Sequence, residues 1–132
     1  VVHEFCHSFT KIKGDTEKAL EKSGKALQEY TYFSMRRQAY STWRNILEES
    51  LVRAATICYL IDHDYDEKDI RNAIIEQVDR NFFWMPELVQ TLRYYESHRK
   101  KYPTFTSFYP EIIRFFDRYV TNMEKEMKKA MK

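Results

Sequence analysis

Apolar residues recur every three or four positions along most of this chain, which is the spacing of an amphipathic helix. The clearest stripe lies in residues 42–62 and consists of Trp43, Ile46, Leu47, Leu51, Ala54, Ile57, Cys58 and Ile61. A second stripe near the end of the chain consists of Ile112, Ile113, Phe115, Phe116, Tyr119 and Val120. The pattern therefore predicts a series of helices that bury one face each.

Capping and turn residues predict where these helices begin and end. The expected helices cover residues 1–10, 16–40 with a possible break at 32–34, 42–62, 67–78, 87–101, and a last helix with Pro110 in its first turn. Asp15 or Thr16 is expected to cap the second helix and Ser41 the third, and Asp66 or Glu67 opens the fourth. The predicted fold is an all-α bundle of about five or six helices.

Composition supports this class and bounds the organisation of the chain. Only two of the 132 residues are glycine and three are proline, which argues for helices and against a β-sandwich or barrel. The length suits a single helical domain over residues 1–132. Cys6 and Cys58 are too few for a disulfide framework, so both are expected to be small buried fillers.

Charge excludes some classes of partner. The 22 basic and 20 acidic residues nearly cancel, and no basic stripe with interleaved aromatics stands out, so nucleic-acid binding has little support. No apolar run is long enough to span a membrane, and no signal peptide is visible.

The motif that carries chemistry is His3-Glu4-Phe5-Cys6-His7, which has the form H-E-x-x-H. Residues four apart lie on one face of a helix, so His3 and His7 can bind one zinc ion while Glu4 lies beside it. Zinc lowers the pKa of a bound water to about 7, and the glutamate then acts as general base. The alternative is a surface helix with two histidines and a solvated acid, but half of the four histidines fall inside this motif, between apolar flanks.

Zinc in such sites usually has a third protein ligand. A metzincin would place glycine and histidine where Thr10 and Lys13 stand, so that class is excluded. Glu48 and Glu49 are the natural alternatives, and we favour Glu49 because Arg53, one turn further on, can orient its carboxylate. A solvated helix face is the competing explanation for both glutamates.

The motif, together with segments 49–54, 83–88, 102–105 and 108–110, resembles a bacterial family of unknown function whose members carry H-E-x-x-H as gluzincin-type zinc metallopeptidases. The resemblance spans nearly the whole chain. It implies a longer native protein, with a sheet-containing half before the motif, of which this chain is the C-terminal helical part. It also implies export, to the periplasm or outside the cell, in many members.

The leading hypothesis is a peptidase that hydrolyses peptide or protein substrates with zinc held by His3, His7 and Glu49 and with Glu4 as base. An oxyanion donor would come from Tyr95, Tyr102, Tyr109, His98 or Arg53. Phe83, Trp84 and Met85 are expected either to line a substrate cleft or to anchor the core. The alternative function is an inactive helical interaction domain that retains the signature.

Overall fold

The computed structural model describes residues 12, 14–40 and 42–131, and these residues form helices and connections without any strand. The helices are α2 (Asp15–Tyr30), α3 (Tyr32–Arg37), α4 (Trp43–Asp62), α5 (Glu67–Asp79), α6 (Met85–Ser97) and α7 (Phe105–Ala130). The predicted all-α class is thus confirmed. The helix predicted for residues 1–10 lies outside the described residues.

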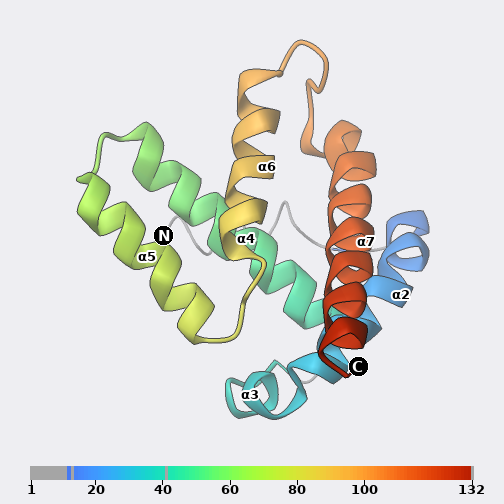
Figure 1. Cartoon of the computed structure of the whole chain (residues 1–132). Coiled ribbons are helices and arrows are strands. Elements are labelled where there is room, and N and C mark those ends of the chain that lie inside the picture. The colour runs from blue at the N-terminus through green and yellow to red at the C-terminus, as the bar shows by residue number, and fades with distance from the viewer. Residues whose placement is uncertain (1–11, 13, 41, 132) are drawn as a thin grey trace.

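Helix α4 occupies the centre of the described fold (Figure 1). It packs against α2, α5 and α6, and α7 in turn packs against α2 and α6. In Figure 1, α5 lies on one side of α4, and α2 and α7 lie on the other. None of the described helices combines the length and the apolar character needed to cross a bilayer.

The core is built from the stripes that the sequence predicts, with α4 contributing one wall. Fully buried residues of the core include Leu20, Leu27, Ile46, Leu47, Leu51, Trp84, Met85, Leu88, Phe108, Ile112 and Phe116. Burial of such side chains is the main stabilising contribution in a domain of this size. Cys58 is buried and free, as expected for a small apolar filler.

Local capping decides where the helices begin, and it corrects two predictions. Thr42, not Ser41, is the N-cap of α4, because its side chain accepts a hydrogen bond from the Asn45 N–H at 3.2 Å. Asp66 caps α5 as predicted. Helix α2 begins one residue after Gly14, so neither Asp15 nor Thr16 is its cap.

The start of α7 differs most from expectation. Pro110 lies inside the helix and not in its first turn, because Thr104 and Ser107 form a capping box that starts α7 at Phe105. The helix continues through Pro110, and its buried face of Phe108, Ile112, Phe115 and Phe116 lies on both sides of the proline. Helix α6 also begins earlier and ends at Ser97 instead of Lys101.

Three helices end in the same way although no glycine is present. After α3, α4 and α5 a residue adopts a positive φ: Ala39 (69°), Asp64 (55°) and Asn81 (73°). In each case the next residue donates its N–H to the carbonyl five positions earlier, as in the bond from Tyr40 to Met35 at 2.8 Å. This is the Schellman arrangement, in which glycine usually takes the left-handed position.

The tight contact between α2 and α4 depends on Gly24. A Cβ atom built there would lie 2.4 Å from the ring of Trp43 at the start of α4. Any larger residue at position 24 would therefore force the two helices apart or displace the indole.

A buried hydrogen bond attaches the start of α6 to α4. The Trp84 Nε1–H donates to Ser50 Oγ at 2.8 Å, and Ser50 Oγ–H donates to the Ile46 carbonyl at 2.6 Å. Trp84 and Ser50 are both fully buried. An indole N–H in the core needs such a partner, since leaving it unpaired is costly.

We therefore predict that Ser50→Ala destabilises the fold by about 1–3 kcal/mol, because it leaves the indole N–H buried without an acceptor. In a Trp84→Phe background, Ser50→Ala should cost about 1 kcal/mol less, since no donor remains. Urea unfolding of the four proteins measures this difference. Equal costs in both backgrounds would show that the bond does not couple the two helices.

Candidate metal centre

The motif residues His3, Glu4 and His7, with Cys6 between them, lie outside the described residues. The described part of the candidate site is the segment of α4 from Glu48 to Arg53. In the described ranges, no three histidine, cysteine, aspartate or glutamate side chains gather as a group that could hold a metal ion. Any complete centre would therefore combine α4 with the motif.

Glu49 is buried and is held by Arg53, as the sequence predicts. The carboxylate is 5% exposed, and Arg53 Nε donates to Glu49 Oε1 at 3.1 Å across one turn of α4. This contact fixes the orientation of the carboxylate through one of its two oxygens. An arginine that positions a ligand carboxylate in this way is typical of the support around metal sites.

The other donors of Arg53 are engaged by residues far from it in the sequence. Arg53 Nη1 donates to Gln77 Oε1 of α5 at 2.7 Å, and Nη2 donates to the Tyr40 hydroxyl at 3.0 Å. The guanidinium also lies over the ring of Phe82, 5.1 Å from its centroid. Gln77 and Tyr40 were missed by sequence reasoning, because neither the pattern nor the spacing relates them to Arg53.

Glu48 is also buried, at 8% exposed, but it faces another part of the structure. Its Oε1 accepts a hydrogen bond from the Ile12 N–H at 3.0 Å. Its charge also acts on Tyr109 of α7. Burial, and secondly the charge of Glu48, raise the pKa of Tyr109 to about 12. Tyr109 therefore keeps its proton at neutral pH and remains a hydrogen-bond donor.

The burial of both carboxylates overturns the solvated-face explanation. Adjacent residues on a helix point about 100° apart, so the two glutamates meet different partners although both are buried. Burying a carboxylate is costly unless donors compensate it. Arg53 compensates Glu49, and the Ile12 N–H compensates Glu48.

The structure separates the candidate oxyanion donors. Arg53 and Tyr109 are the candidates whose described contacts lie at the α4 carboxylates. Tyr95 instead packs against Phe105 and Phe108. His98 is exposed and stacks on Tyr94 at the end of α6.

Two of the residues proposed to line a cleft belong to the core. Trp84 and Met85 are fully buried, whereas Phe83 is 37% exposed. The ring of Phe83 packs edge-on against Tyr30, with centroids 6.0 Å apart. Core anchoring is therefore correct for Trp84 and Met85.

A second polar cluster, which sequence reasoning missed, joins the end of α4 to α6. Arg93 pairs with Asp62 and lies 3.6 Å from Glu96 Oε2. Burial, and then a hydrogen bond with Asp62, raise the pKa of Glu96 to about 7. The hydrogen bond from Glu96 lowers the pKa of Asp62. The two carboxyl groups therefore share one proton near neutral pH.

The thiol of Cys58 lies beneath this cluster. Burial, and secondly the charge of Glu96, raise its pKa well above the ordinary range. Cys58 Sγ also lies 3.8 Å from the Val89 carbonyl as a weak donor. A protonated, buried thiol is not a nucleophile, so this cysteine has a packing role.

Comparison with known proteins yields one match. A family model described as "Domain of unknown function (DUF4932)" matches residues 1–115. No curated protein and no solved structure matches the chain.

We predict that Arg53→Met lowers the free energy of unfolding by about 3–5 kcal/mol, because it leaves Glu49 buried without its counter-charge. The double variant Glu49→Leu/Arg53→Met should recover a large part of this loss. The matched control is Arg71→Met, whose pair with Glu67 has side chains 65% and 90% exposed; it should change stability by no more than about 0.5 kcal/mol. Chemical unfolding measures the stability of all three variants. An equal loss of stability in Arg53→Met and Arg71→Met would contradict the prediction.

We also predict that stability falls as the pH rises from about 5 to 8 through the pKa of Glu96. The folded pKa is raised, so the folded chain binds the extra proton and is favoured below this range. Glu96→Gln, which mimics the neutral acid, should flatten this part of the pH profile, and Asp62→Asn should reduce its slope. Thermal unfolding at pH 5 and pH 8 tests this. An unchanged slope in Glu96→Gln would contradict it.

Proposed function

The chain belongs to the family described as domain of unknown function DUF4932, and we propose that it acts as a zinc-dependent peptidase. In this proposal His3, His7 and Glu49 would hold a zinc ion, which would supply an activated water as the nucleophile for a peptide bond. Glu4 would be the base that accepts a proton from this water and returns it to the leaving amine.

The observation that carries the proposal is the buried Glu49–Arg53 pair. A zinc ligand must be oriented and shielded from bulk water, and Glu49, which accepts from Arg53 Nε and is 5% exposed, meets both requirements. A carboxylate offers about four lone-pair positions. The contact of Glu49 with Arg53 is therefore compatible with a metal bond from the same group.

Chain connectivity gives a second support. Ile12 follows His7 by five residues, and its N–H is bonded to Glu48, the neighbour of Glu49 on α4. Five residues of chain span at most about 18 Å. This length of chain is compatible with His7 and Glu49 binding the same ion.

Tyr109 is our choice for the oxyanion donor. Its raised pKa keeps the hydroxyl protonated, which a donor to a developing negative charge requires. The charge of Glu48 acts on this hydroxyl, so Tyr109 lies on the side of α4 to which Ile12 is bonded.

The proposal also concerns the wider protein. We infer that this all-α chain is the C-terminal helical half of a gluzincin-like α+β metallopeptidase, because its motif and blocks resemble that class. Export of the protein stays a prediction of the same resemblance. The alternative, an inactive interaction domain, stays open to the experiments below.

The direct test is metal content together with peptide cleavage. We predict one zinc per chain by elemental analysis, lost in His7→Ala. Glu4→Gln should keep zinc but lower cleavage of a peptide library about 10²–10⁴-fold, since it lacks the base. His98→Ala, at an exposed histidine of α6, is the matched control and should keep both zinc and activity. Zinc that survives His7→Ala would exclude the proposed centre.

A second comparison assigns the third ligand. We predict that Glu49→Gln weakens zinc binding at least about tenfold, since a neutral amide is a poor zinc ligand. Glu48→Gln should retain zinc and reduce stability, because it weakens the bond from Ile12 and leaves Glu49 in place. Competition with a chromogenic chelator measures both affinities. The reverse result would make Glu48 the ligand, and equal affinities would exclude both.

A further inference from the structure

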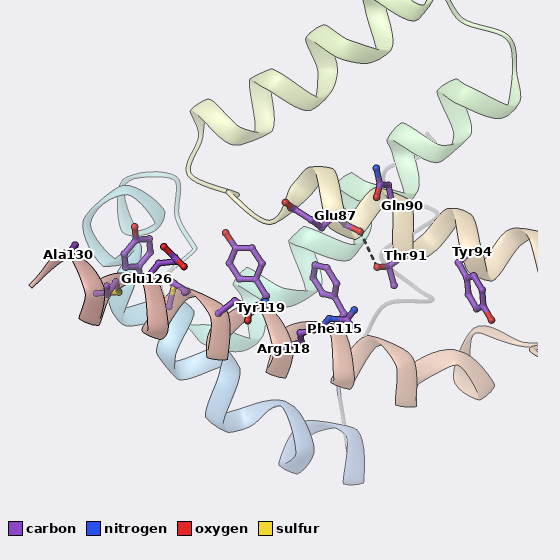
Figure 2. Close-up of a pocket in the computed structure, with 13 residues that line it drawn as sticks. Glu87, Gln90, Thr91, Tyr94, Phe115, Arg118, Tyr119, Glu126 and Ala130 are labelled. Atoms are coloured by element: carbon purple, nitrogen blue, oxygen red, sulfur yellow. Dashed lines mark hydrogen bonds between the residues drawn. The ribbon is translucent and has the colours of Figure 1, made fainter. Parts of the chain in front are cut away.

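A groove of about 850 Å³ runs between α6 and the second half of α7. Glu87, Gln90, Thr91 and Tyr94 line it from α6, and residues of α7 line the opposite wall; Figure 2 shows Thr91 and Tyr94 on the side of α6 that faces α7. Its volume is in the range of sites that bind small ligands or short peptides. It contains none of the α4 residues of the candidate metal centre.

Exposed apolar side chains gather along this groove. Tyr30, Tyr94 and Met127 line it and are 49%, 43% and 44% exposed. Phe83, which is also exposed, packs against Tyr30. Contiguous exposed apolar side chains mark interaction sites, and methionine adapts readily to varied partners.

The groove also carries charges from both walls. Glu87 of α6 and Arg118 of α7 line it, and neither forms an ion pair with a described residue. A second carboxylate, Glu126, lies 3.4 Å from Lys129 Nζ at the surface. Burial, and secondly the charge of Glu87, raise the pKa of the Tyr119 hydroxyl between these walls. The groove therefore offers a carboxylate at Glu87 that can pair with a cation and a guanidinium at Arg118 that can pair with an anion.

Amide side chains complete the lining. Gln90 and Asn122 reach the groove from opposite walls, and both are exposed. An amide side chain can donate to and accept from the backbone of an extended peptide. The groove thus combines aromatic and methionine surfaces, two amide side chains and a carboxylate. These groups together can recognise a peptide.

We propose that this groove binds a linear peptide segment in which an apolar side chain lies next to a basic one. The apolar side chain packs against Tyr119 and Met123, and the basic one pairs with Glu87. Gln90 and Asn122 bind the peptide backbone. This site is independent of the zinc centre and does not require peptidase activity.

A peptide suits the groove better than a second copy of the chain. A twofold contact through this face would set one concave surface against another and leave a void between them. A narrow segment with a positive charge fills the space and complements the charge of Glu87.

The test uses the purified chain with zinc removed by EDTA, so its result does not depend on the proposed peptidase. Fluorescence polarisation compares a labelled decapeptide of alternating leucine and lysine with two versions, one with glutamate for lysine and one with serine for leucine. We expect saturable binding of the first peptide and at least about tenfold weaker binding of the others. Glu87→Lys should raise the Kd about tenfold. The matched control is Glu124→Lys, which makes the same charge change on α7 outside the groove and should raise it no more than about twofold.

Several results would overturn the proposal. One is no saturable binding of the leucine–lysine peptide up to about 1 mM. Another is equal weakening by Glu87→Lys and Glu124→Lys, which would indicate a general charge effect. A concentration-dependent dimer that Met127→Glu dissociates in sedimentation experiments would assign the groove to a second copy instead.

Discussion

The guanidinium of Arg53 connects four segments of the fold at one buried point. It binds Glu49 on its own helix, Gln77 on α5 and Tyr40 before α4, and it lies over Phe82 after α5. No residue of α5 is fully buried, so apolar packing alone holds this helix weakly. The polar contact through Gln77 therefore fixes α5 against α4. Ala39, which follows α3, contributes to this contact. Its left-handed backbone conformation directs the chain so that the hydroxyl of Tyr40 reaches Arg53.

Two adjacent buried carboxylates on α4 are difficult to explain by folding alone. A buried ion pair such as Glu49–Arg53 is often no more stabilising than apolar residues of similar volume. Glu48 adds a second buried charge, compensated by the N–H of Ile12. Apolar residues such as leucine and alanine are far more common than glutamate at such buried positions. The presence of both acids on α4, one of them bonded to Ile12, is consistent with the proposed metal site.

Local signals predicted more of the structure than long-range ones. The apolar stripe of α4 and the Glu49–Arg53 pair were predictable because both depend on spacing within one helix. Pro110 misled the prediction of α7, since proline is common in a first turn and the nearby capping box was not weighed against it. The partners of Arg53, the Asp62–Glu96 pair and the groove depend on which helices meet. The spacing of residues within a single sequence carries no information about contacts between different helices.

The choice between an enzyme and an interaction domain depends on where a nucleophile can arise. A peptide groove between α6 and α7 suits either function, because binding a peptide does not activate water. Among the described residues, the thiol of Cys58 is kept protonated by burial, and the Asp62–Glu96 pair holds its proton between two helices. The buried carboxylates of α4 differ from these groups, since Glu48 accepts from the Ile12 N–H and Glu49 accepts from Arg53 Nε. An oriented carboxylate can bind a metal ion, so the proposed hydrolysis requires that α4 and the H-E-x-x-H motif bind the same ion.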